Sequence, residues 1–182
     1  MKHIGTKNNL LLFLLLFVAS QLCAQTPEFN LNKSFGGLYP DRGNAVTTDV
    51  NGNIYMTGET FSPSLDFGNN IVLTAPGLTG TGNCEFFLTK FDELGNALWS
   101  KKGGGSLTDR GYGVVVDNTG NLVVAGHYYG LATFDTVTRT SAGNLDAFIA
   151  KYDTSGNIMW FHDGKDAAQS SVRGLAYDNN GN

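Results

Sequence analysis

The sequence predicts an all-β protein, a β-propeller of four-stranded antiparallel blades that is present here as a fragment of about two and a half blades. The first observation is a repeat, because residues 87–99 and 148–160 match each other at a spacing of 61 positions. Each copy has an apolar strand, an Asp-x-x-Gly-Asn turn and a second apolar strand, which is the pattern of a β-hairpin. A repeat of this length is typical of propellers and other repeat architectures.

The second observation is another family of the same turn, at 49–53, 117–121 and 178–182. Each repeat therefore contains two hairpins and four strands, as a propeller blade does. In the best-preserved unit the strands are expected at the following positions: 113–117, 122–128, 147–153 and 158–162. The three valines at 114–116 do not alternate with polar residues, which indicates a strand buried on both faces between neighbouring blades.

The blade units are expected at about 43–101 and 111–162, and a third unit is expected to begin at 174–182. Extra residues in the first unit fall around 74–80, a turn-rich stretch that predicts a loop insertion. Residues 29–35 precede the first unit as a fourth strand would, so we expect them to complete a blade at one terminus. The sequence stops inside a turn of the third unit, and for this reason we expect the chain to be a fragment.

Residues 1–24 have the pattern of a secretory signal peptide: two lysines, an apolar run at 10–19 and small residues after it. The run is shorter than the roughly 20 residues that span a bilayer, so we expect no stable membrane span and a secreted or cell-surface location. Cleavage is expected between Ser20 and Ala24, which leaves the partial propeller in 25–182. Lipidation at Cys23 is less favoured, because the residues just before it are not small.

Charge and cysteine content exclude other classes. The formal net charge of −4 becomes −6 without the two lysines of the signal peptide, and the remaining basic residues are scattered. Nucleic acid is therefore excluded as a partner. Without Cys23 the chain keeps only Cys84, so no internal disulfide is expected, and we interpret Cys84 as a small buried side chain.

The double turn and its tryptophan resemble the bacterial SBBP β-propeller repeats. The second unit carries the pattern most fully, in Gly113, Val114, Asp117, Gly120, Asn121, Gly126, Asp146, Phe148, Lys151, Tyr152, Asp153, Gly156, Asn157 and Trp160. The first unit departs from it with Ala45, Glu85 and Phe91. The resemblance implies a secreted or surface protein of bacteria, often with further domains, and it implies no catalytic residues and no cofactor.

The Asp-x-x-Gly-Asn turns allow two interpretations. Asp49-x-Asn51-x-Asn53 has the spacing of early calcium ligands, but the middle position is Leu94 in a sister turn, and leucine cannot bind a metal. We therefore predict structural turns and no metal. The predicted structural residues are Asp49, Gly52, Asp92, Gly95, Asp117, Gly120, Asp153 and Gly156.

An Asp-Arg-Gly triplet stands before the first strand of the first two units, at 41–43 and 109–111, and the third has Arg173-Gly174 at a shifted position. Arg42 and Arg110 are candidates for lining the mouth of the central channel. The alternative is that each arginine pairs with the aspartate beside it and braces neighbouring blades.

His127 with Tyr129, and His162, are weak candidates for a binding or catalytic cluster, but no second histidine or acid is spaced to complete a metal site or triad. We therefore predict a non-catalytic module that binds an extracellular protein or glycan, or acts as a scaffold. The alternative is a propeller-type lyase or hydrolase with its site in another part of the protein. Chain parity places the variable connections at the end opposite the short turns, and these loops are expected at 61–82, 101–110, 128–143 and 162–173. A partner is expected there, with Arg42, Arg110, His127, Tyr129 and His162 as first contacts.

Overall fold

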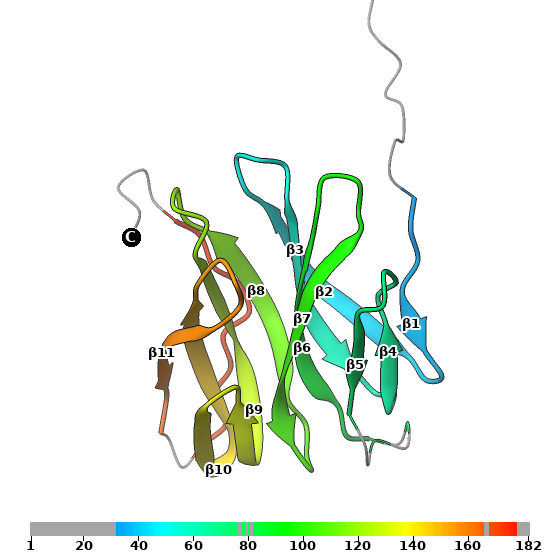
Figure 1. The fold of residues 1–182 in the computed structure, drawn as a ribbon. Coiled ribbons are helices and arrows are strands. Elements are labelled where there is room, and N and C mark those ends of the chain that lie inside the picture. The colour runs from blue at the N-terminus through cyan, green and yellow to red at the C-terminus, as the bar shows by residue number, and fades with distance from the viewer. Residues whose placement is uncertain (1–31, 76–77, 79, 81, 166–167, 178–182) are drawn as a thin grey trace, which may run out of the picture. The chain divides into compact units, whose positions relative to one another are not determined.

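The computed structural model describes residues 32–75, 78, 80, 82–165 and 168–177, which belong to a compact unit that begins at Lys33, apart from Asn32. These residues form eleven strands and no helix (Figure 1). The strands are β1 Gly36–Gly37, β2 Asp41–Thr48, β3 Ile54–Thr60, β4 Ser64–Asp66, β5 Val72–Thr74, β6 Glu85–Phe91, β7 Ala97–Gly105, β8 Arg110–Val116, β9 Leu122–Phe134, β10 Val137–Tyr152 and β11 Ile158–Asp163.

Two four-stranded antiparallel blades make up the fold, which confirms the prediction of an all-β partial propeller. Blade 1 pairs its strands in the order β2, β3, β6, β7, and blade 2 in the order β8, β9, β10, β11. The second and third strands of blade 2 are much longer than the predicted 122–128 and 147–153. The signal peptide at 1–24 and the turn at 178–182 lie outside the described residues.

The connection between strands two and three of blade 2 is not the loop predicted at 128–143. Instead β9 and β10 continue as a hairpin whose tip is at Asp135, and this hairpin folds back toward blade 1 (Figure 1). The fold-back places Phe134 beside Gly103, so that β9 pairs with the end of β7. A side chain at Gly103 would collide with the Phe134 ring, which explains the glycine. We call this element the return hairpin of blade 2.

Blade 1 has an equivalent return hairpin, formed by β4 and β5. Here residues 61–63 are not strand, so β3 and β4 are two separate strands. The partner of this hairpin is β1, where Gly36 pairs with Asp66 and Gly37 with Leu65. This repeats the pairing of Gly104 and Gly105 with the return hairpin of blade 2. Residues 33–37 therefore lie where a fourth strand of a preceding blade would end. Of the strand predicted at 29–35, the described residues 32–35 are not assigned as strand.

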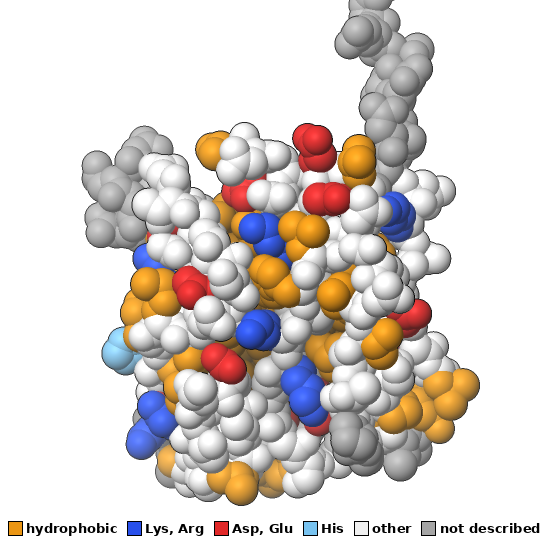
Figure 2. All heavy atoms as spheres, viewed as in Figure 1, with side chains coloured by type: hydrophobic (Ala, Val, Ile, Leu, Met, Phe, Trp, Pro, Cys, Tyr) orange, Lys and Arg blue, Asp and Glu red, His pale blue; other side chains and the backbone are white. Residues whose placement is uncertain are grey.

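Two hydrophobic cores stabilise the fold, one between the two blades and one on the other face of blade 1. The core between the blades gathers aromatic rings, among them Tyr55, Phe86, Phe134 and Phe148. The second core covers the far face of blade 1 and is closed by the β4–β5 hairpin and by Phe35. On the surface shown in Figure 2, apolar side chains are interspersed with charged side chains of both signs.

Candidate functional site

The four described Asp-x-x-Gly-Asn turns share one hydrogen-bond pattern. In each turn the aspartate Oδ1 accepts the backbone N–H groups two and four residues later, at 2.7 to 3.0 Å. The side-chain amide of the last asparagine donates to Oδ2 of Asp49, Asp92 and Asp153. These contacts lower the pKa of Asp92, chiefly through Asn96, and of Asp153, chiefly through Asn157. Each carboxylate is thus engaged by its own turn.

The turn glycines have left-handed backbone, with φ of 81° at Gly52, 72° at Gly95, 84° at Gly120 and 79° at Gly156. A side chain is strained at such φ values, so glycine is required by the backbone. This geometry explains the repeated residues without a metal. Among the described residues, no group of three or more His, Cys, Asp or Glu side chains could hold a metal ion.

The aspartates of the Asp-Arg-Gly triplets accept hydrogen bonds from backbone N–H groups and do not pair with the neighbouring arginines. Asp109 is fully buried and accepts the backbone N–H of Gly105 at 2.8 Å and of Tyr129 at 3.1 Å. Asp41 does the same for Gly37 and Phe61. Burial raises the pKa of Asp109 to about 7, although the two N–H groups act against that rise. Each aspartate therefore connects the segment just before its blade to the second strand of the blade or the residue after it.

Arg42 and Arg110 both contact Glu59, which corrects the predicted pairing of each arginine with its neighbouring aspartate. The Arg42 Nη1 lies 3.1 Å and the Arg110 Nε lies 3.8 Å from Oε1 of Glu59. The Asn44 Nδ2 donates to Oε2 of Glu59 at 2.7 Å. Since Arg110 begins blade 2, this ion pair does connect neighbouring blades. We call Arg42, Asn44, Glu59 and Arg110 the blade 1 cluster.

The equivalent position in blade 2 holds His127 in place of Glu59, 68 residues later. His127 is opposite Arg110 in the β8–β9 ladder, as Glu59 is opposite Arg42. Its ring packs edge-on against Tyr112, which stands where blade 1 has Asn44. The guanidinium carbon of Arg173 lies over the Tyr112 ring, 4.9 Å from its centre. We call Arg110, Tyr112, His127 and Arg173 the blade 2 cluster.

His127 is buried, and neither ring nitrogen has a hydrogen-bond partner among the described residues. Burial, together with the positive charges of Arg110 and Arg173, lowers the pKa of His127 to about 4. The ring is therefore neutral at pH 7. The blade 2 cluster has two arginines and no acid of its own, whereas the blade 1 cluster has Glu59.

The other predicted contacts lie apart from this cluster. Tyr129 is half-buried and is held through its backbone by Asp109. His162 is exposed on β11, where its ring lies 5.2 Å from that of Trp160. The sequence analysis missed Glu59, which could have been found from the replacement of glutamate by histidine at equivalent positions of the repeat.

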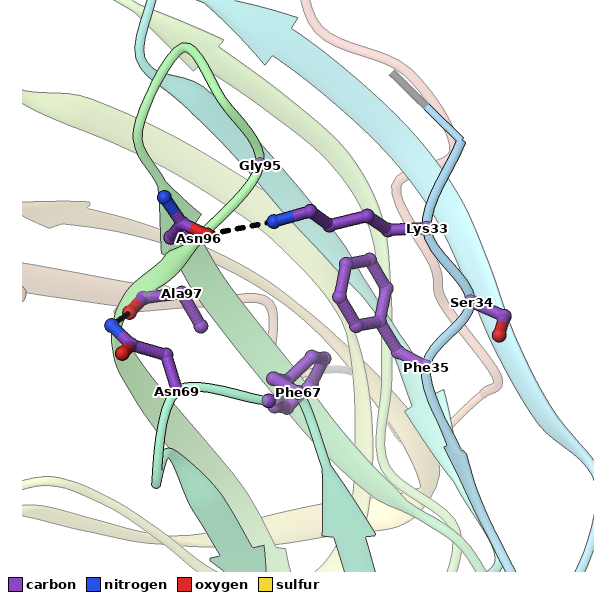
Figure 3. A pocket seen from close by; sticks show the side chains of 9 residues that line it. Lys33, Ser34, Phe35, Phe67, Asn69, Gly95, Asn96 and Ala97 are labelled. Atoms are coloured by element: carbon purple, nitrogen blue, oxygen red, sulfur yellow. Dashed lines mark hydrogen bonds between the residues drawn. The ribbon is translucent and has the colours of Figure 1, made fainter.

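A hollow of about 220 Å³ lies beside the return hairpin of blade 1 (Figure 3). There the Lys33 ammonium donates to Asn96 Oδ1 at 2.7 Å, and the Asn69 amide donates to the Ala97 carbonyl at 2.8 Å. The repeat makes Lys33 equivalent to Lys101, which lies against the corresponding turn of blade 2 at Gly156. The contact of Lys33 with the turn at Gly95 and Asn96 is therefore equivalent to the contact of Lys101 with the turn at Gly156, which joins the two blades.

Within the described residues, no helix is long and apolar enough to cross a membrane. No family model matches the chain. The chain is similar to an uncharacterized WD repeat-containing protein, L264, of Acanthamoeba polyphaga mimivirus. The two are 25% identical over 145 residues, which cover 74% of this chain and 10% of the relative. The chain thus spans about a tenth of the length of that relative, and the similarity agrees with a propeller-type repeat fold.

Proposed function

We propose that the chain belongs to a non-catalytic β-propeller that is secreted or displayed at the cell surface and binds a partner protein. The observation that carries the proposal is a row of arginines: Arg42 and Arg110 lie at the starts of β2 and β8, and Arg173 lies in the segment that follows β11. The Arg42 side chain is 60% exposed, and Arg173 is exposed as well. They stand on a rigid two-blade frame at the end opposite the short turns. Such a row favours a partner that presents acidic side chains.

The similarity to a WD repeat-containing protein supports a module that interacts through its blades, as does the resemblance to SBBP repeats. The return hairpins change where the interaction surface is expected. The hairpin of blade 2 pairs with β7 of blade 1, and the hairpin of blade 1 pairs with β1. The loops predicted at 61–82 and 128–143 are therefore not free binding loops along their whole length. The arginines and the connections between blades, at 101–110 and 162–173, remain as the expected contact surface at the end opposite the short turns.

The binding test uses the full chain and an array of matched peptides that are acidic, basic or neutral. We expect the wild-type protein to bind acidic peptides and the double variant R42Q/R173Q to bind them about tenfold more weakly, which is a loss of about 1.4 kcal/mol. A matched control is K90Q/K102Q, which removes two cations from blade 1 outside the row. Equal losses in both variants, or binding to a glycan array instead, would count against an acidic protein partner.

Export is tested separately by joining residues 1–24 to a reporter enzyme that is active only outside the cytoplasm. We expect activity with the native segment and none when two arginines interrupt the apolar run at 10–19, because charge in that run prevents signal recognition. Reporter activity from the interrupted segment would contradict a signal peptide.

A further inference from the structure

The blade 2 cluster differs from the blade 1 cluster by the loss of an acid. In blade 1 the Glu59 carboxylate accepts hydrogen bonds from Arg42 and Asn44 and forms a longer ion pair with Arg110, at 3.8 Å. In blade 2 the same position of the strand is His127, which brings no negative charge to Arg110 and Arg173. The frame of the two clusters is the same, since Arg110 opposes His127 as Arg42 opposes Glu59.

The unsatisfied atoms lie at the place where blade 1 holds its carboxylate. Both His127 nitrogens are buried without a partner, which costs free energy in a folded protein unless a ligand or water provides one. The Arg173 side chain is exposed and lies over Tyr112, next to the His127 ring. The segment that carries Arg173 is joined to β9 by a 3.4 Å backbone hydrogen bond from Val172 to Gly126. Arg173 can therefore turn aside without breaking a ladder of strand hydrogen bonds.

The geometry points to a carboxylate-binding site in blade 2, in which a carboxylate from outside the chain takes the place that Glu59 fills in blade 1. Arg173 and one N–H of His127 would donate to its two oxygens. The inference rests on the proposed function, because it names an aspartate or glutamate side chain of the partner as the group that is bound. A free small carboxylate has the same chemistry and serves as a probe without any partner.

The carboxylate class is preferred for a reason internal to the repeat. The site keeps the arginine at the start of the first strand, Arg110 for Arg42, and has Tyr112 for Asn44 and His127 for Glu59. Arg173 comes from the segment that follows β11 and adds a second arginine. Arginine forms paired hydrogen bonds with planar carboxylates, and a neutral histidine provides one further donor. The aromatic ring of Tyr112 limits the width of the site, so a carboxylate on a narrow chain fits better than a bulky anion.

The test measures the unfolding temperature of the full chain at pH 6.5 against N-acetylglutamate amide, with N-acetylglutamine amide and with sodium chloride of equal ionic strength as references. A bound ligand raises this temperature according to its occupancy. We expect the glutamate probe to raise it in a saturable way and to shift the His127 ring ¹⁵N signals. No difference between the glutamate probe and the two references would overturn the inference, as would a response to phosphate alone.

Two variants identify the site. H127E restores an internal acid between Arg110 and Arg173, so we expect a higher unfolding temperature and no response to the glutamate probe. R173Q changes an exposed side chain and should fold, and we expect a response at least about tenfold weaker in affinity. R139Q is the matched control, because Arg139 is a partly exposed arginine of blade 2 outside both clusters, and it should respond as the wild type does. A response that persists in H127E and R173Q would place the binding elsewhere and overturn the inference.

The peptide array tests the proposed function by a different readout. Acidic peptides that bind while the small carboxylate fails at His127 would leave the proposed function standing and overturn this inference alone. A small carboxylate that binds while all peptides fail would support the site and count against the protein partner.

Discussion

Blades 1 and 2 have the same strand pairing, the same turns and, at their starts, aspartates that accept equivalent backbone N–H groups, yet they differ at one position of the second strand, Glu59 in β3 and His127 in β9. In blade 1 the Glu59 carboxylate pairs with Arg42 and Arg110, whereas in blade 2 the neutral His127 is near the positive charges of Arg110 and Arg173. Blade 1 interrupts the second strand before its return hairpin, whereas blade 2 runs through in one strand. The comparison teaches that the repeat preserves backbone and core, and that differences between blades are concentrated where side chains meet across blades.

The largest expected effect distinguishes the two return hairpins. Phe134 packs against Phe86, Tyr128, Phe148 and Phe161, with ring centres 4.9 to 5.9 Å apart. We expect F134A to lower the free energy of unfolding by about 3–5 kcal/mol, because a large cavity would open in the core between the blades. Urea titration measures it.

The matched variant is F67A in blade 1. Phe67 contacts Phe35, Phe87 and Phe91, one ring fewer, and it lies in the smaller core. We expect a loss at the low end of the same range, about 3 kcal/mol. An equal or larger loss in F67A would show that the two hairpins do not differ in the way the ring contacts indicate.

These return hairpins show what the sequence could and could not predict. The strands around the Asp-x-x-Gly-Asn turns were predicted because glycine and apolar runs act locally. The stretch 131–140 does alternate, with Ala132 and Phe134 buried, but its many polar residues and a length that differs from blade 1 favoured a loop. Its partner is β7 of the other blade, and such a contact depends on how blades stack.

The cluster around His127 was only partly predictable for the same reason. His127 and Arg110 were candidates from the sequence, because they are polar residues near strand ends. The role of Glu59 depends on Arg110 of the next blade, and no local pattern gives the distance between strands of different blades. Comparing equivalent positions of the repeat would have revealed the replacement of an acid by a histidine.

The second prediction concerns pH and blade 2 alone. His127 keeps a pKa of about 4 in the folded protein, while an unfolded histidine has a pKa of about 6.5. Between these values the unfolded chain binds a proton that the folded chain does not, so wild-type stability falls as the pH drops from about 6.5 to 4. We expect this loss to reach roughly 2–3 kcal/mol relative to H127Q.

The comparison with H127Q removes the contribution of other groups. Asp109, whose pKa is about 7, favours the folded state as the pH falls from 7 toward 4, but it is present in both proteins and cancels in the difference. Denaturant titrations at several pH values measure the difference. A constant difference across this range would mean that His127 is already protonated or exposed.

The third prediction compares equivalent turns. Gly156 and Gly95 have φ of 79° and 72°, so alanine at either should destabilise by about 1–2 kcal/mol. At Gly156 an added Cβ would also lie 3.2 Å from the Trp99 ring of blade 1. We therefore expect G156A to be the more costly of the two by thermal unfolding. A larger loss of stability in G95A than in G156A would mean that the Trp99 ring moves to accommodate the new methyl group.

The smallest expected effect concerns the two tryptophans that the repeat places in register. Trp99 donates its Nε1–H to the Thr154 carbonyl at 3.3 Å and so joins blade 1 to the turn of blade 2. Trp160 is 36% exposed and has no such bond among the described residues. We expect W99F to lower stability by about 0.5–1.5 kcal/mol, the value of one hydrogen bond, and W160F to change it by less than about 0.5 kcal/mol. Differential scanning calorimetry of both variants provides the comparison, because the same substitution is made in the same strand position. If W160F cost as much as W99F, the stability would come from packing within each blade, and the contact between Trp99 and the neighbouring turn would have no measurable part in holding the blades together.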